Sequence, residues 1–105
     1  MLVIDIPDGP DVEFLVALGE DVATLRLRWN ARAASWYLDV ADADGVPILS
    51  GQRLAVNMRV GAKSAHPFFA KHMIVAVDTS GERRDPGLDD LGRRVLLTWT
   101  EAGGG

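Results

Sequence analysis

Two histidines, His66 and His72, are the only imidazoles in the chain and therefore its first candidates for acid–base chemistry or metal binding. Their spacing does not place two ligands on one face of a helix, so it predicts no metal site. Ser64, His66 and one of the aspartates could in principle form a catalytic triad, but a triad is defined by its geometry, and these residue types occur together by chance in most chains of this size. We therefore expect no catalytic residues and no enzymatic activity.

Two further features could belong to ligand sites, an Asp-rich turn and the glycines of the chain. Asp42, Asp44 and Gly45 look like the opening of a calcium loop, yet residues 46–48 supply no further acidic ligand and no glutamate closes the loop. The carboxylates can instead accept hydrogen bonds from nearby backbone amides, and the glycine can adopt a positive φ, which predicts a chain reversal. The other glycines are scattered singly, so we expect no phosphate-binding loop and no cofactor.

Alternation of apolar and polar residues predicts strands along most of the chain. The clearest pattern spans residues 25–30, as expected for an antiparallel sheet with one face in water. A short connection leads to the strand that contains Trp36, so these two strands should form a hairpin with Trp29 and Trp36 near its closed end. Pro47 cannot donate a hydrogen bond to a neighbouring strand, which predicts a sheet edge. Further strands are predicted at residues 2–6, 11–18, 46–49, 74–77 and 94–100.

These strands, with turn signals between them and no convincing helix, predict an all-β fold, a small antiparallel barrel or sandwich built from hairpins. Residues 1–101 should form a single β domain, and the glycine-rich residues 102–105 should be a disordered tail. Residues 52–73 keep no regular period and are expected to be loops. The predicted core consists of Leu25, Leu27, Trp29, Trp36, Leu38, Val40, Val95, Leu97 and Trp99.

The three tryptophans allow two interpretations. They stand at alternating apolar positions, which makes them members of the core by default. Small β domains also use tryptophan to stack on sugars or bases. The alternative is therefore a free-standing β binding module that takes a carbohydrate or peptide on exposed tryptophans.

Two segments are least explained by a core, and such segments are where partner contacts usually lie. In Gly61–Met73, the aromatic side chains either form an exposed apolar patch for a protein interface or plug one end of the fold. Residues 78–91 read as a long exposed loop with two adjacent arginines, the cation favoured in interfaces. The candidate protein interface consists of Phe68, Phe69, Met73, Arg83 and Arg84.

Composition narrows the class of protein. The chain has 105 residues, which is enough for one domain, and it contains no cysteine, so neither disulfides nor thiolate chemistry are available. No apolar run approaches the roughly 20 residues that span a bilayer. A net charge of -4 argues against a nucleic-acid partner, which would need a basic surface. The first residues lack the pattern of a secretory signal, so we expect synthesis in the cytoplasm.

Several parts of the sequence together resemble the baseplate plug family of contractile-tailed bacteriophages. These parts are Trp36-Tyr37-Leu38-Asp39-Val40, Asp44-Gly45-Val46-Pro47-Ile48, Gly51-Gln52-Arg53-Leu54, Leu91-Gly92 and Leu97-Thr98-Trp99. They follow in the family's order and spacing, and the resemblance covers nearly the whole chain. The chain departs from the family's pattern between Ala62 and Met73, where residues 65–72 replace a more glycine-rich segment.

The resemblance implies a small β structural subunit of a phage or prophage-derived tail, without a catalytic role. Its place would be the baseplate of the virion, near the axis where tube and hub meet, as a plug or adaptor. Its partners would be hub, tube or wedge subunits, and copies of the chain could surround the tail axis. Neither membrane insertion nor a nucleic-acid site is expected.

Overall fold

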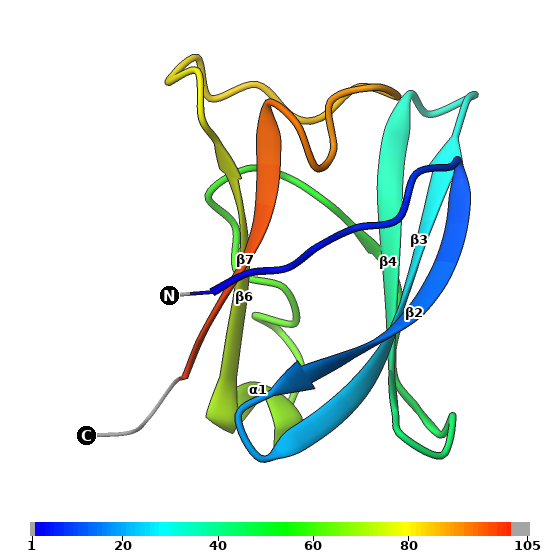
Figure 1. The fold of residues 1–105 in the computed structure, drawn as a ribbon, viewed down its shortest axis with the longest axis vertical. Coiled ribbons are helices and arrows are strands. Elements are labelled where there is room, and N and C mark those ends of the chain that lie inside the picture. Colours follow the sequence, from blue (N-terminus) through cyan, green and yellow to red (C-terminus); the bar gives the residue numbers. More distant parts are fainter. Residues whose placement is uncertain (1, 102–105) are drawn as a thin grey trace.

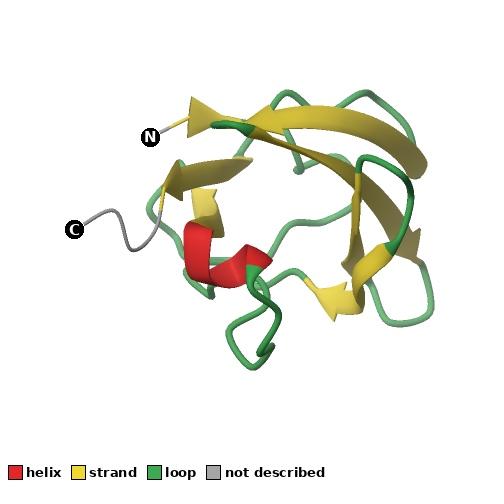
Figure 2. Ribbon diagram, turned by 90° about the horizontal axis from the view of Figure 1, so that it is seen from below, coloured by secondary structure: helices red, strands yellow, loops and turns green. Residues whose placement is uncertain are grey.

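Two antiparallel sheets pack face to face in the computed structural model, which describes residues 2–101 (Figure 1). The larger sheet has the strand order β2-β3-β4-β5 and the smaller has the order β1-β7-β6. The elements are β1 (Leu2–Val3), β2 (Asp11–Leu18), β3 (Asp21–Asn30), β4 (Ser35–Asp42), β5 (Pro47–Arg53), α1 (Phe68–Lys71), β6 (His72–Asp78) and β7 (Val95–Glu101). The predicted all-β fold is confirmed, as an open two-sheet arrangement and not as a closed barrel (Figure 2).

The four-stranded sheet is built from consecutive hairpins, as the sequence predicted. Trp29 and Trp36 face each other across β3 and β4 next to the connecting turn, with ring centroids 5.6 Å apart in an edge-to-face arrangement. The next reversal is a turn and not a ligand loop, because one carboxylate oxygen of Asp42 accepts the backbone N–H groups of Asp44 and Val46, each at 2.9 Å. Pro47 then begins β5, which is an edge strand.

The core lies between the sheets and contains most of the predicted residues. Leu25, Leu27 and Leu38 are fully buried, because alternate side chains of neighbouring strands point to the same face. Two of the expected members, Trp29 and Trp99, are only partly buried and pack against the rim of the core. The remaining buried apolar residues are Ile4, Leu18, Ala23, Trp36, Val40, Leu54, Val60, Phe68, Phe69, Ile74, Ala76, Val95 and Leu97.

The stretch between β5 and β6 is more ordered than its sequence suggested. It holds the four-residue helix α1, which the sequence did not predict because one turn is too short to show a helical period. Upstream, single β-bridges join Val56 to Ala76 and Arg59 to Val75, so this stretch also covers the outer edge of β6. The expectation of loops is correct for most of the length of this stretch, but the stretch also contributes a helical turn and covers the edge of β6.

The ends of two strands differ from the prediction. β1 ends at Val3, although the next residue, Ile4, is buried and still donates its N–H to the carbonyl oxygen of Leu97 at 2.8 Å. β6 begins at His72, two residues earlier than predicted, because the chain leaves α1 directly into the sheet. The predicted glycine-rich tail at residues 102–105 lies outside the described residues.

Candidate partner-binding surface

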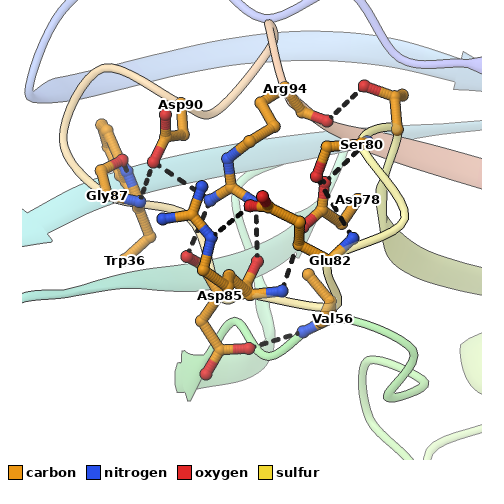
Figure 3. Close-up of polar contacts among 11 residues, drawn as sticks. Trp36, Val56, Asp78, Ser80, Glu82, Asp85, Gly87, Asp90 and Arg94 are labelled. Carbon is orange, nitrogen blue, oxygen red and sulfur yellow. Dashed lines mark hydrogen bonds and ion pairs between the residues drawn. The ribbon is translucent and has the colours of Figure 1, made fainter.

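The loop at residues 79–94, between β6 and β7, is held by a nearly buried ion pair (Figure 3). Asp78, the last residue of β6, pairs with Arg94 at the far end of the loop, and their side chains are only 2% and 15% exposed. The carboxylate of Asp78 also accepts the hydroxyl and N–H of Ser80, at 2.7 and 2.9 Å, and the N–H of Arg84 at 3.0 Å. One side chain therefore fixes the first turn of the loop and joins it to the last residue.

These contacts lower the pKa of two carboxyl groups, that of Asp78 just before the loop and that of Asp90 within it. The hydroxyl of Ser80, helped by backbone N–H donors and by Arg94, lowers the pKa of Asp78 to about 2, although burial acts in the opposite direction. Hydrogen bonds from Arg94 and from the N–H of Gly87 lower the pKa of Asp90. Both groups are therefore ionised at neutral pH, and both stabilise the loop as anions.

The guanidinium of Arg94 organises the middle of the loop. It donates to the carbonyl oxygens of Arg84 at 3.1 Å and Asp85 at 3.0 Å, and to the carboxylate of Asp90 at 3.1 Å. Arginine suits this position because its planar group offers five N–H donors in fixed directions. The sequence showed an arginine after a loop, but nothing in it indicated that this side chain turns back into the loop.

Other contacts tie the loop to the larger sheet. Asp85 accepts a hydrogen bond from Arg53 and one from the N–H of Val56, both at 2.9 Å. The indole of Trp36 donates to the carbonyl oxygen of Gly87 at 2.9 Å. The loop is thus fixed to both sheets before any partner arrives, which lowers the entropy lost when it binds one.

The outer side of this loop presents exposed residues of mixed character. Arg83 is exposed, has a φ of 58°, and makes no ion pair with residues 2–101. The neighbouring Arg84 pairs with Glu82 at 2.7 Å, and Leu88 is 48% exposed. A fixed loop with charged and apolar side chains directed to solvent is suited to contact another protein.

The remaining predicted interface residues lie elsewhere. Met73 is half-buried on β6, whereas Phe68 and Phe69 are 9% and 4% exposed and belong to the core. The interpretation of the two phenylalanines as an exposed patch is corrected by their burial, and the alternative that they plug one end of the fold describes them. The reason is α1, which turns both rings inward, while Arg59 donates to the carbonyl oxygen of Phe69.

The two segments expected to contact partners lie at opposite ends of the molecule. Gly61–Met73 leads through α1 into the start of β6, whereas the 79–94 loop follows its last residue, Asp78. Figure 1 shows α1 at the lower end of β6 and the loop at the upper end. Because a strand of 7 residues separates them, a single small contact does not engage both.

The side chains considered for catalysis or metal binding form hydrogen bonds within the fold. His66 Nδ1 accepts the N–H of Phe68 at 3.1 Å, and Ser64 Oγ accepts the N–H of His66 at 3.2 Å. His72 is buried, and its Nδ1 accepts the indole N–H of Trp99 at 3.0 Å. An indole can only donate, so His72 Nε2 carries the proton in its 2.7 Å contact with Asp21.

Within residues 2–101, the structure shows no metal centre and no fully exposed tryptophan: Trp36 is buried, and Trp29 and Trp99 are partly buried. No three His, Cys, Asp or Glu side chains among the described residues cluster so that they could hold a metal ion. The indoles of Trp36 and Trp99 use their N–H groups inside the protein, and Trp29 stands edge-on to Trp36. The binding-module interpretation needs exposed tryptophans, and the structure exposes only parts of Trp29 and Trp99. None of the helices described is both long and apolar enough to cross a membrane.

Comparison with known proteins matches the chain to a protein family. Residues 1–102 match the family model described as "Cyanophage baseplate Pam3 plug gp18". The match extends over both sheets and over both segments considered for partner contacts. No curated protein matches the chain.

Proposed function

The chain belongs to this cyanophage baseplate plug family, and on that basis we propose that it is a plug or adaptor at the end of the tail where tube and hub meet. Its role in the phage baseplate is structural. The observation that carries the proposal is the family match, which covers the whole described fold. The proposed partners are hub, tube or wedge subunits of the tail, and further copies of the chain arranged around the tail axis.

The geometry supports an adaptor. The 79–94 loop, fixed at one end of β6, and the segment 61–73, at the other end, give the molecule two separate surfaces. A subunit placed between two neighbours along an axis needs such a pair of surfaces. Burial of Phe68 and Phe69 leaves the backbone and the polar residues of the second segment for contact, while Arg83 and Arg84 are exposed cations of the first.

We propose no catalytic role, no cofactor and no nucleic-acid site for this subunit. His66 and His72 are hydrogen-bonded within the fold, and the net charge is -4. Assays of the purified protein against generic ester, phosphodiester and glycan substrates should therefore show no hydrolysis. A hydrolytic activity that disappears in both the His66→Ala and the His72→Gln variants would overturn the non-enzymatic part of the proposal.

A matched pair of variants tests whether the 79–94 loop contacts a partner in the tail. Arg83→Glu reverses an exposed charge on the 79–94 loop, and Arg32→Glu reverses an exposed charge in the turn between β3 and β4. Both variants should keep the parent circular dichroism spectrum and melting temperature. In a phage that lacks its own copy, we expect Arg83→Glu to enter tails at least tenfold less often than Arg32→Glu. Equal incorporation of the two variants would show that the loop is not part of the interface.

Location is read directly from a map of the intact tail. A reconstruction by electron cryomicroscopy should show density for the fold on the tail axis where the tube meets the hub. Density at the baseplate periphery would contradict the plug or adaptor position, while leaving the baseplate role intact.

A further inference from the structure

The two sheets have four outer edges, and among the strands that the structure describes only one edge is long, regular and open. β1 has 2 residues. β5 begins with a proline and shifts register against β4, and both features disfavour pairing of this edge with a further strand. β6 is covered by the bridges from Val56 and Arg59. β2 has 8 residues in unbroken register with β3 and no neighbour on its other side among the described strands.

The backbone of β2 divides into an inward and an outward set. The N–H of Trp29 in β3 donates to the carbonyl oxygen of Pro10 at 2.8 Å, and Leu18 pairs with Asp21 across the turn. Hydrogen-bonding residues alternate along an antiparallel strand, so the even-numbered residues of β2 bond to β3. The N–H and C=O groups of the odd-numbered residues therefore point away from the sheet. These residues are Asp11, Glu13, Leu15 and Ala17.

The core beside this edge is incompletely covered. The inward-facing side chains of β3, such as Leu25 and Leu27, are fully buried, whereas Val12, Phe14 and Val16 of β2 stay half-buried. In Figure 1 the N-terminal segment diverges from β2 toward β7, so no strand lies along the lower part of β2. On the outer face, Leu15 is 65% exposed. A strand added beside β2 would cover all of these apolar groups.

We propose that the free edge of β2 binds an extended segment of a neighbouring tail protein, which adds a fifth strand to the larger sheet. The inference rests on the proposed function. Main-chain hydrogen bonds to the four outward residues supply the attachment, and alternate side chains supply the specificity. The segment carries apolar residues on the side of Val12, Phe14 and Val16. On its other side it carries a lysine or arginine near Glu13, whose carboxylate makes no ion pair with residues 2–101.

The charges of the edge favour a different protein over a second copy of this chain. An antiparallel pairing of two β2 strands that used all four outward residues would place Glu13 opposite Leu15 of the copy. The two Glu13 residues would then be diagonal neighbours on the same face, with backbones about 7 Å apart. Like charges at such positions destabilise a strand pair, whereas a basic residue from another protein stabilises it.

Proline substitution distinguishes the outward backbone groups from the inward ones. Leu15→Pro removes an N–H that points away from β3, which an edge strand tolerates, whereas Val16→Pro removes one that bonds to β3. We expect Leu15→Pro to remain folded but to enter tails at least tenfold less often than the parent, and Val16→Pro to unfold. Leu15→Thr keeps the N–H and the strand propensity and loses only part of the apolar contact, so it should enter tails far more often than Leu15→Pro. Normal incorporation of folded Leu15→Pro would overturn the inference.

Hydrogen exchange of the parent protein gives a test that does not depend on the folding of any variant. The amides of Asp11, Glu13, Leu15 and Ala17 should exchange rapidly in the free protein and at least a hundredfold more slowly in purified tails. Unchanged exchange in tails that contain the protein would overturn this inference alone. Absence of the protein from tails would overturn the proposed function together with it. Protection of the same amides in the isolated protein at high concentration would identify a second copy as the occupant and would overturn the assignment to another protein.

Discussion

The indole N–H of Trp36 reaches the carbonyl oxygen of Gly87, 51 positions later in the chain, at a distance of 2.9 Å. The bond joins a buried strand of the larger sheet to the middle of the 79–94 loop. The same glycine donates its N–H to Asp90 at 2.8 Å, and Asp90 is held by Arg94. The core and the proposed partner-binding loop are therefore one connected structure.

Substitutions at Trp36 should separate packing from this hydrogen bond. Trp36→Ala removes a large buried side chain and should lower the free energy of unfolding by about 3–5 kcal/mol. Trp36→Phe keeps an aromatic ring in the core but leaves the carbonyl oxygen of Gly87 without its donor, at a cost of about 1–2 kcal/mol. Urea unfolding measures both changes. A Trp36→Ala variant that unfolds like the parent would show that this side chain does not hold the core together.

Stability should fall in acid because the folded chain lowers the pKa of Asp78 and Asp90. A carboxylate with a lowered pKa contributes stability above its ordinary value of 3.8, and that contribution is lost as the pH falls through the folded value, about 2 for Asp78. Thermal unfolding between pH 7 and pH 2 should therefore show a drop in melting temperature mainly below about pH 4.

Asp78→Asn identifies the group responsible for part of this loss. The amide cannot pair with the charge of Arg94, so the variant should melt below the parent at pH 7. The difference should shrink as the pH falls from about 4 to about 2, because the parent then loses the same charge. A difference in melting temperature that stays constant down to pH 2 would contradict the assignment to Asp78.

Two glycines offer a matched pair for close packing around α1. Gly61 has a φ of 72°, and a Cβ placed there would lie 2.7 Å from the ring of Phe69. Gly45 has a φ of 83° but has no neighbour within 4 Å of such a Cβ. Gly45→Ala should cost only the left-handed backbone strain, about 1–2 kcal/mol. Gly61→Ala should cost that strain and a further 1–3 kcal/mol, roughly, for overpacking the core.

Chemical denaturation of the two alanine variants provides the comparison. The larger loss for Gly61→Ala should disappear when Phe69→Ala makes room for the methyl group, so the double variant should show no additional penalty beyond that of Phe69→Ala and the backbone strain. Equal losses for Gly61→Ala and Gly45→Ala in the parent background would show that the ring of Phe69 is not packed against this turn.

Strand existence and hairpin pairing followed from local patterns in the sequence. Alternation over residues 25–30, the short connection to Trp36 and the turn at Asp42–Gly45 are read from neighbouring residues, and each appears in the structure. The edge position of Pro47 followed from its missing N–H. The family could also be inferred from the sequence, because its motifs are short runs in a fixed order.

The candidate surface could be inferred from the sequence only as a region. The sequence marked residues 78–91 and the pair Arg83 and Arg84, because turn residues and charges gather there. It did not show that Asp78 and Arg94 close the loop, since a 16-residue separation carries no periodic signal. It also left Phe68 and Phe69 equally suited to a surface or a core, because hydrophobicity alone does not say what covers a side chain.

The sequence by itself thus determined which segments are strands, which neighbours form hairpins and which family the chain resembles, because these depend on residues close together in the chain. Tertiary structure alone decided which edge remains open. β5, β6 and β2 all have strand patterns, but β6 is covered by residues 56–59 and β5 is irregular. Within residues 2–101, β2 alone keeps a long row of backbone groups without a neighbouring strand. Coverage of an edge depends on segments distant in the sequence, and only the packed chain brings them together.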